Sequence, residues 1–478
     1  MDGFDLNKIP KTYFVLEFKG PGGYMPLGYT KYTLPIVMQY KLQNPNDIEF
    51  AGYYSSVHNP SEYFYNTSAE FSHYIIQYTK NTQFVLTKDI KNKIKSENLY
   101  LVVLESLNVN NMFEYYSSDK IQLEDMFSPD LLNLIKDNIN FKIVFVDAGE
   151  GAYLHNITLL EKIHNFLKRN NINHKDKVFI STNNNNIVDL KKSKKFLKFS
   201  NQIHVFPNNY LITSAGRFMS ILRSGATHLI QQDGYDYSIQ TELKFNKKEK
   251  KFLMYNRNSE RMHRAYFVNL LYKNNLLDKG FISFLENPNF VKFLNQNKAY
   301  PILNLTKEDN LDIKNNYKNY YPLVIDDADP DRVSEYHNFL SRKDEYEKSY
   351  FTIISETNAE TSYSFLTEKT IKPIMNLHPF VVLGNPNTLD VLKSHGFKTF
   401  DKWWDESYDT IKDFKTRANS LLNLVNSLCN KTDDEWIEML KEMEETLIYN
   451  QKLLHKLSTE KREIKNFFKH ILHEKPLL

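Results

Sequence analysis

A glutamate and a Thr-Glu-Lys triplet lie between two short apolar runs and could bind a ligand together. The residues are Glu356 and Thr367-Glu368-Lys369, and the runs cover residues 350–354 and 379–384. A carboxylate can bind ribose hydroxyls and a neighbouring ammonium can bind phosphate, so the combination suits a nucleoside diphosphate. The simpler interpretation is a solvated helix start with Thr367 as its capping residue. Spacing alone leaves both interpretations open.

The elements around this cluster should form a strand, a loop, a helix and a second strand. Both apolar runs are short and rich in β-branched and aromatic residues, which is typical of strands buried on both faces of a parallel sheet. Thr367 can start a helix whose buried positions include Ile371, Ile374 and Met375. Ligands of open α/β sheets sit beyond the carboxyl ends of the strands, and a helix N-terminus there attracts phosphate.

A second polar cluster follows an apolar run at residues 252–255. That run ends in Asn256-Arg257, and Ser259 can cap a helix that carries Arg261, His263 and Arg264. Arg261 and Arg264 are three positions apart, so on one helix face they could clamp phosphate oxygens. The alternative is an amphipathic helix with a basic outer face. Such a helix would pack through Met262, Tyr266, Leu270 and Leu271.

The two clusters together resemble the donor-site signature of the family 10 fucosyltransferases. In that family a strand ends in Phe-Glu-Asn, a Thr-Glu-Lys triplet follows, and the next strand has the type Pro-Val-Val-x-Gly. The matching segments here are Ser355-Glu356-Thr357-Asn358, Thr367-Glu368-Lys369 and Pro379-Phe380-Val381-Val382-Leu383-Gly384. The likeness also includes the polar turn and helix start near Arg257, and it extends over about residues 250–400.

The resemblance implies a GT-B glycosyltransferase that uses a nucleotide-sugar donor, a GDP-sugar by family likeness, with inversion and without a metal ion. The residues that would neutralise the leaving diphosphate are Arg257, Arg261, Arg264 and Lys369. Glu368 would hold the ribose, and Glu356 would orient donor hydroxyls or brace the cations. Thr367 completes the expected donor site as the helix cap.

The acceptor side of such a site needs a group that takes the proton of the attacking hydroxyl. A predicted strand at residues 141–146 ends in Asp147-Ala148-Gly149-Glu150-Gly151, so Glu150 is the first candidate base and Asp147 the second. The equal alternative is a βα turn in which Asp147 caps the next helix. The motif Asp326-Asp327-Ala328-Asp329 could hold a metal in a GT-A enzyme, but it precedes Pro330 and reads as a loop.

Alternating strand and helix patterns predict an α/β fold with two Rossmann-like domains that face a cleft. The first predicted strands are 99–104, 141–146, 178–181 and 203–206, and a helix is expected at 158–170. The second series is 252–255, 323–326, 350–354 and 380–383. The first hundred residues look irregular. The expected domains are an acceptor domain at 1–245, a donor domain at 246–408 and C-terminal helices at 409–478 that pack back across the domains.

Composition limits the class of protein. The chain has 478 residues, 41% of them hydrophobic, which is enough for two cores. Its single cysteine, Cys429, excludes an internal disulfide framework and a cysteine-based zinc site. A leader-like start and a membrane span are both missing from the sequence pattern, so we expect a cytoplasmic protein without a membrane span.

The acceptor divides the remaining hypotheses. A saccharide acceptor follows from the resemblance, and a hydroxymethylated base in viral DNA is the alternative. A non-catalytic nucleic-acid-binding protein on a degenerate transferase fold is the third possibility. The net charge of +3 is too balanced to indicate DNA binding by itself. Lysines do cluster at residues 191–195 and 247–251. Charge runs of this kind usually belong to solvated faces or linkers.

Overall fold

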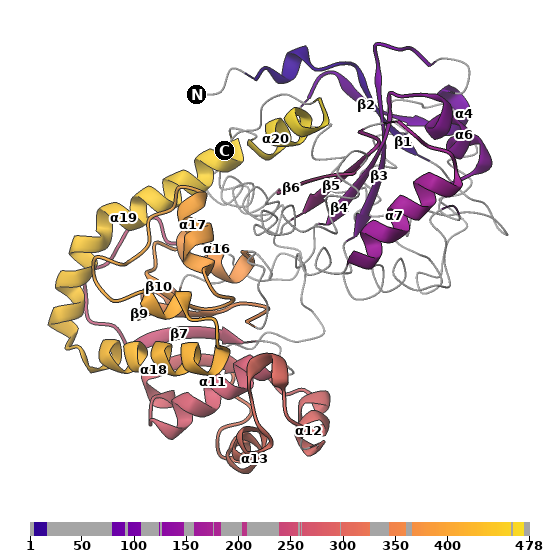
Figure 1. Ribbon diagram of the computed structural model, residues 1–478. Coiled ribbons are helices and arrows are strands. Elements are labelled where there is room, and N and C mark those ends of the chain that lie inside the picture. Colours follow the sequence, from indigo (N-terminus) through magenta and orange to yellow (C-terminus); the bar gives the residue numbers. More distant parts are fainter. Residues whose placement is uncertain are drawn as a thin grey trace, which may run out of the picture. The chain divides into compact units, whose positions relative to one another are not determined.

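The computed structural model divides the chain into two compact units, one formed by Met1–Tyr210 with Lys461–Leu478 and the other by Leu211–Glu460 (Figure 1). The residues that the structure describes are 4–16, 79–90, 94–106, 124, 127–147, 157–174, 176–182, 203–207, 239–256, 259, 261–296, 298–325, 344–359, 366–459 and 462–472. The domain boundaries expected at 245/246 and 408/409 remain predictions.

The first unit is built on a parallel sheet of six strands in the order β2-β1-β3-β4-β5-β6. The strands are β1 (Thr12–Leu16), β2 (Thr82–Leu86), β3 (Leu99–Ser106), β4 (Phe141–Asp147), β5 (Val178–Thr182) and β6 (Ile203–Pro207). Tyr13, Tyr100 and Phe141 stack across β1, β3 and β4, with ring centroids 5.2 and 4.7 Å apart. This stack joins neighbouring strands on one face of the sheet.

The helices of the first unit are α4 (Thr87–Ile90), α6 (Pro129–Asp137), α7 (Ile157–Arg169) and α20 (Arg462–Ile471). Ser128 caps α6 by accepting from the Leu131 N–H, and the helix buries Leu131, Leu134 and Ile135. The helix α20 comes from the far end of the chain and packs on β6, where the rings of His470 and Phe206 stack at 4.5 Å.

The second unit has a parallel sheet of four strands in the order β10-β9-β7-β8. The strands are β7 (Lys250–Asn256), β8 (Gly280–Phe284), β9 (Ser349–Ser355) and β10 (Phe380–Leu383). Every residue of β9 and β10 is buried, as a parallel sheet covered on both faces requires. The predicted α/β class with two Rossmann-like sheets is therefore confirmed.

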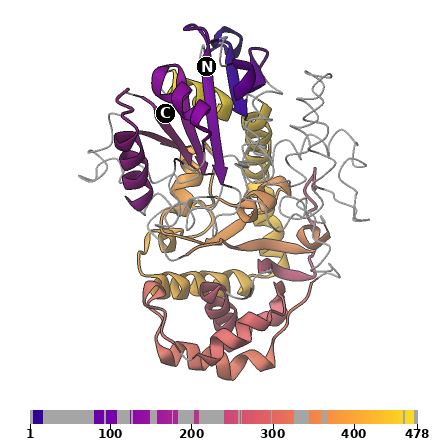
Figure 2. The same ribbon diagram turned by 90° about the vertical axis from the view of Figure 1, so that its right-hand side faces the viewer.

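The helices of the second unit cover both faces of its sheet, with α18 on one side and α16 on the other (Figures 1 and 2). They are α11 (Met262–Lys273), α12 (Pro288–Asn295), α13 (Lys307–Asn316), α15 (Asp344–Glu347), α16 (Glu368–Met375), α17 (Thr388–Ser394), α18 (Phe414–Asn430) and α19 (Asp433–Thr459). Trp436 of α19 is fully buried and stacks on Tyr350 and Phe351 of β9, both at 5.3 Å.

Several sequence predictions were wrong in detail. The described part of the segment predicted as a strand at 323–326, residues 323–325, is not a strand, because Leu323 makes an isolated antiparallel bridge with Phe284 and no ladder follows it there. The first hundred residues are not entirely irregular, since they contain β1, β2 and the start of β3. Ser259 does not cap α11, whose N-cap is Arg261 without a side-chain cap hydrogen bond.

Candidate functional site

The carboxyl ends of β7 and β9 form the switch point of the second sheet. The chain leaves β7 toward β8 on one side of it, while β9 continues to β10 on the other side. Two neighbouring parallel strands whose connections diverge in this way leave a crevice beyond their carboxyl ends, where ligands of open α/β sheets bind. Asn256 ends β7, Ser355 ends β9, and Glu356 directly follows it.

Glu356 lies at this point as a buried carboxylate that binds the N-terminus of α16. It is 2% exposed and accepts hydrogen bonds from the hydroxyls of Thr367 and Thr370. The backbone N–H of Thr367 also donates to Glu356 Oε1, at 3.3 Å. Burial raises the pKa of Glu356 above its usual value, against the opposing effects of Lys369 and of the two hydroxyl donors. The strand end and the helix start are thus joined by one side chain.

Thr367 caps α16 as its sequence position predicts, and the cap places Glu368 and Lys369 in the first turn. The Thr367 hydroxyl oxygen accepts from the Lys369 N–H at 3.2 Å. The Lys369 ammonium pairs with the Glu368 carboxylate and donates to the Thr357 hydroxyl at 3.4 Å. The side chains of Lys369 and Glu368 are 19% and 22% exposed, so both remain open to a ligand.

The charge of Glu368 is maintained by its neighbours. Burial alone would raise the pKa of this carboxyl, but the charge and hydrogen bond of Lys369, with Lys372, hold the pKa below its usual value. An ionised carboxylate is a hydrogen-bond acceptor only, which is the property that binding of ribose hydroxyls needs.

The start of α11 approaches the same loop from the other side. Arg261 donates from Nη1 to Asn358 Oδ1 at 3.3 Å and is partly exposed. Arg264 is 3% exposed and donates from Nη2 to the Glu356 carbonyl at 3.1 Å. His263 is fully buried, and its Nε2 lies 2.9 Å from the same carbonyl, which can only accept, so Nε2 carries the proton.

These contacts give the two arginines different surroundings. The sequence predicted that Arg261 and Arg264 share one face of a helix. In the structure Arg261 is the N-cap residue before α11, and Arg264 lies inside the helix. Arg264 binds the backbone carbonyls at the end of β9, whereas Arg261 binds the side-chain amide of Asn358 in the loop that follows. A phosphate role for Arg264 remains a prediction.

Two further polar groups at the switch point were missed as site residues from the sequence. Asn256 is fully buried, and among the described residues neither its amide nitrogen nor its amide oxygen has a hydrogen-bond partner. The Ser355 hydroxyl is also buried and has no partner in the part of the chain that the structure describes. Buried polar groups in native proteins are normally satisfied by protein, water or ligand. The available signal was a polar residue that directly follows an apolar run at the end of each strand.

Other predicted site residues lie outside the described residues. They are Arg257 and Glu150. The Asp326-Asp327-Ala328-Asp329 motif, which was predicted to be a loop, also lies outside the described residues. Asp147 ends β4, where its Cα pairs with Ser106 and Thr182, and the structure describes its backbone only. The roles of Glu150 and Asp147 remain predictions. Within the described residues no group of His, Cys, Asp or Glu is arranged to hold a metal ion.

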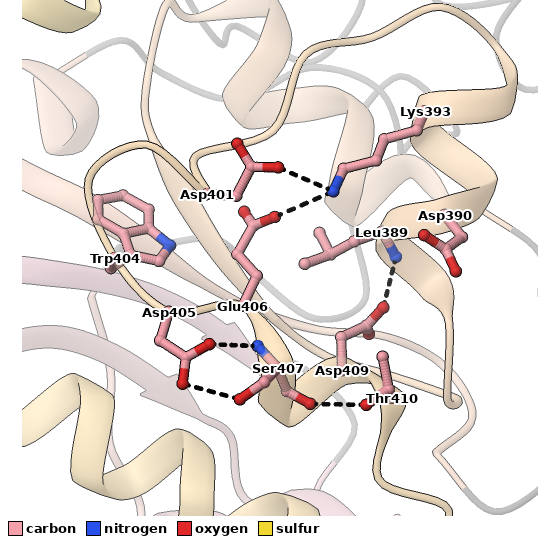
Figure 3. A pocket seen from close by; sticks show the side chains of 10 residues that line it. All are labelled: Leu389, Asp390, Lys393, Asp401, Trp404, Asp405, Glu406, Ser407, Asp409 and Thr410. Atoms are coloured by element: carbon pink, nitrogen blue, oxygen red, sulfur yellow. Dashed lines mark hydrogen bonds and ion pairs between the residues drawn. The ribbon is translucent and has the colours of Figure 1, made fainter.

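A separate acidic cavity of about 290 Å³ lies beside α17 (Figure 3). Its lining residues are Leu389, Asp390, Lys393, Asp401, Trp404, Asp405, Glu406, Ser407, Asp409 and Thr410. Several of these groups bind one another: Lys393 pairs with Asp401 and Glu406, and Asp409 accepts from the Leu389 N–H at 2.8 Å. These contacts hold the segment 401–410 against α17.

The described helices also bear on membrane association. None of them combines the length and the apolar character that a bilayer span requires.

Comparison with known proteins gives only distant structural neighbours. An α,α-trehalose-phosphate synthase (UDP-forming) from Burkholderia vietnamiensis is 8% identical over 91% of this chain and 82% of its own, with a TM-score of 0.33. The corresponding synthase from Burkholderia xenovorans, in complex with glucose-6-phosphate, is 7% identical over 95% and 99%, with a TM-score of 0.33. The N-terminal domain of Candida albicans trehalose-6-phosphate phosphatase is 9% identical over 95% and 100%, with a TM-score of 0.36. No family model and no curated protein matches the chain. The fold assignment accordingly rests on the two sheets themselves.

Proposed function

We propose that this chain is a glycosyltransferase that binds a nucleoside-diphosphate sugar at the carboxyl ends of β7 and β9. The proposal gives the diphosphate to Lys369 and Arg261 and the ribose to Glu368. Arg264 and His263 hold the strand end that presents Glu356. The GDP-sugar donor, the inversion and the lack of a metal requirement come from the resemblance to the family 10 fucosyltransferases.

The observation that carries the proposal is the capped start of α16 at the switch point of the sheet. Helix N-termini attract phosphate because the aligned peptide dipoles leave partial positive charge at that end. Here that start also carries a partly exposed ammonium and a partly exposed carboxylate, on Lys369 and Glu368. A nucleoside diphosphate offers anionic oxygens and vicinal hydroxyls, which match these two groups.

The proposed chemistry depends on charge that develops in the reaction. As the bond between the sugar and the diphosphate breaks, negative charge grows on the departing oxygen. Fixed cations placed near that oxygen stabilise the transition state more than the ground state. Lys369 and Arg261 are the cations assigned to this role. The base that takes the acceptor proton is Glu150 or, in second place, Asp147.

A saccharide is the acceptor that we propose, and nothing in the described residues favours a DNA base. All four lysines of the cluster at 247–251 make internal contacts. Lys247 and Lys251 both pair with Asp433. Lys248 donates to the Lys244 carbonyl at 2.9 Å, and Lys250 donates to the Asp278 carbonyl at 2.7 Å. To bind a DNA backbone, Lys247 and Lys251 would have to exchange their partner Asp433 for a phosphate. The other lysine cluster lies outside the described residues.

The test is a thermal-shift panel with GDP, UDP, ADP and their sugars on three proteins: wild type, Lys369→Ala and Lys441→Ala. Lys441 is a matched control, because it is exposed on α19 and pairs there with Glu438. A ligand that binds the native state at about 100 times its Kd stabilises it by about 2.7 kcal/mol. We expect one nucleotide to raise the Tm of the wild type and of Lys441→Ala but not of Lys369→Ala.

Release of the nucleotide in the presence of an acceptor sugar then tests transfer itself. A wild-type protein whose Tm responds to none of these ligands would contradict the proposed donor site. Equal shifts in Lys369→Ala and in the wild type would contradict the role given to Lys369.

A further inference from the structure

Arg417 of α18 is a buried cation that binds backbone carbonyls from three separate segments. It is 1% exposed. Its Nε donates to the Gly384 carbonyl at 3.1 Å, and its Nη2 donates to the Ala359 carbonyl at 2.6 Å. Its Nη1 donates to the carbonyls of Ile411 and Lys412, at 2.6 and 3.1 Å. All three guanidinium nitrogens are therefore used.

Each of these segments has a defined place in the fold. Ala359 ends the described part of the loop after β9, and Gly384 directly follows β10. Ile411 and Lys412 immediately precede α18. One planar group thus fixes the exits of two neighbouring strands and the entry to a helix. A lysine at this position would offer its donors from a single point and could not reach all four carbonyls in the same way.

The charge of Arg417 persists in spite of its burial. Burial lowers the pKa of the guanidinium to about 10, and the carboxylates of Asp409 and Asp413 oppose that effect. The side chain is therefore positively charged at neutral pH. Hydrogen bonds from a charged donor to neutral acceptors are stronger than those between neutral groups.

The loop that Arg417 holds is the one that meets the cations of the candidate site. Within residues 356–359, Thr357 contacts Lys369 and Asn358 contacts Arg261. The beginning of this loop is fixed by Arg264 and His263, which bind the Glu356 carbonyl. At the other end of the described loop, Arg417 binds the Ala359 carbonyl. The two groups that face Lys369 and Arg261 lie between these two anchor points.

We propose that Arg417 is a positioning residue of the candidate site, which sets the loop of residues 356–359 and through it the places of Lys369 and Arg261. The expected effect of Arg417 on ligand binding rests on the proposed function. Its effect on the conformation of the loop does not, because that effect requires no ligand.

The test compares wild type, Arg417→Lys and Ile313→Ala. Arg417→Lys keeps the positive charge but loses the planar fork. Ile313 is a matched control for lost stability, because it is fully buried in α13, which packs against α11 and α12. Hydrogen exchange measured by mass spectrometry reports on the loop without any ligand. We expect peptides that contain residues 356–359 to exchange faster in Arg417→Lys and to be unchanged in Ile313→Ala.

Nucleotide affinity is measured in parallel, well below the Tm of every variant. We expect the Kd of the nucleotide that binds the wild type to rise about tenfold or more in Arg417→Lys, because misplacement of a site by about 1 Å is costly, and to stay unchanged in Ile313→Ala. Unchanged loop exchange in Arg417→Lys would overturn the inference, as would equal losses of affinity in both variants. A wild-type protein that binds no nucleotide would instead overturn the proposed function, while the exchange data still decide the positioning role.

If Arg417→Lys does not fold, native-state hydrogen exchange of the wild-type chain decides the same point. The loop must then exchange only in openings that also expose α18. Exchange of the loop while α18 stays protected would overturn the inference.

Discussion

The Glu356 carboxylate accepts hydrogen bonds from both the hydroxyl and the backbone N–H of Thr367, so a single pair of residues ties the end of β9 to the start of α16. Because Glu356 is buried, removal of its carboxylate leaves donors without an acceptor. We expect Glu356→Ala to lower the free energy of unfolding by about 2 to 3 kcal/mol, the range for unsatisfied buried donors plus lost packing.

Glu356→Gln is the matched comparison for this prediction. Glutamine keeps the shape and one acceptor oxygen, so the loss should be about half as large or less. Urea denaturation of the two variants, with equal m-values, measures the difference. Equal losses in the two variants would show that the hydrogen bonds to Thr367 and Thr370 contribute little.

Glu368 should matter for ligand binding and little for stability. Its ion pair with Lys369 is partly exposed, and pairs of this kind are worth about 0 to 1 kcal/mol. We expect Glu368→Ala to keep nearly the wild-type Tm and to lose nucleotide binding and sugar transfer. Calorimetry and a nucleotide-release assay on the same preparation check both parts. Full activity in this variant would refute the ribose role.

Local sequence was sufficient to predict the parts of the site that depend on neighbouring residues. Thr367 caps α16, and Ile371, Ile374 and Met375 are buried, because a cap and an apolar stripe act over one or two helical turns. The strands β7, β9 and β10 were predicted within two residues at each end, because fully buried parallel strands are continuous apolar runs.

Long-range contacts could not be predicted in this way. Arg417 meets Ala359 and Gly384, and no local pattern indicates which carbonyls a distant arginine will bind. The strand β8 was missed because Gly280–Phe284 is short and begins with glycine. Ser259 was predicted as a helix cap by residue type alone, but its hydroxyl lies 3.4 Å from the Tyr321 hydroxyl instead.

The buried carboxyl group of Asp409 should make the stability of the protein depend on pH. Burial raises its pKa to about 7, and Asp390 and Glu406 add to the effect. The Leu389 N–H and Arg417 oppose it. Between the ordinary pKa of an aspartate and pH 7 the folded state therefore holds a proton that the unfolded state has released. The contribution of Asp409 to stability is largest at low pH and is lost as pH rises through about 7.

The variant Asp409→Asn has no carboxyl group at this position, so the loss of stability with rising pH should disappear. We expect its Tm, relative to the wild-type Tm, to increase as the pH is raised from about 4 to 7 and then to level off. Asp401→Asn is the control, because it removes an exposed carboxylate that lines the same cavity. Melting curves across this pH range decide the point. A constant difference between Asp409→Asn and the wild type would contradict the buried proton.

Gly280 should be required because Phe252 occupies the space beside it. The two residues pair across β7 and β8, and a Cβ on Gly280 would lie 2.3 Å from Phe252 Cε2. Phe252 is fully buried, so its ring cannot move into solvent. We expect Gly280→Ala to cost about 1 to 3 kcal/mol of stability through overpacking. In a Phe252→Leu background the smaller side chain leaves room, so the same change should cost much less. Urea denaturation of the four proteins gives the interaction energy of the cycle. An unchanged cost in the Phe252→Leu background would show that the ring is not the reason for glycine at this position.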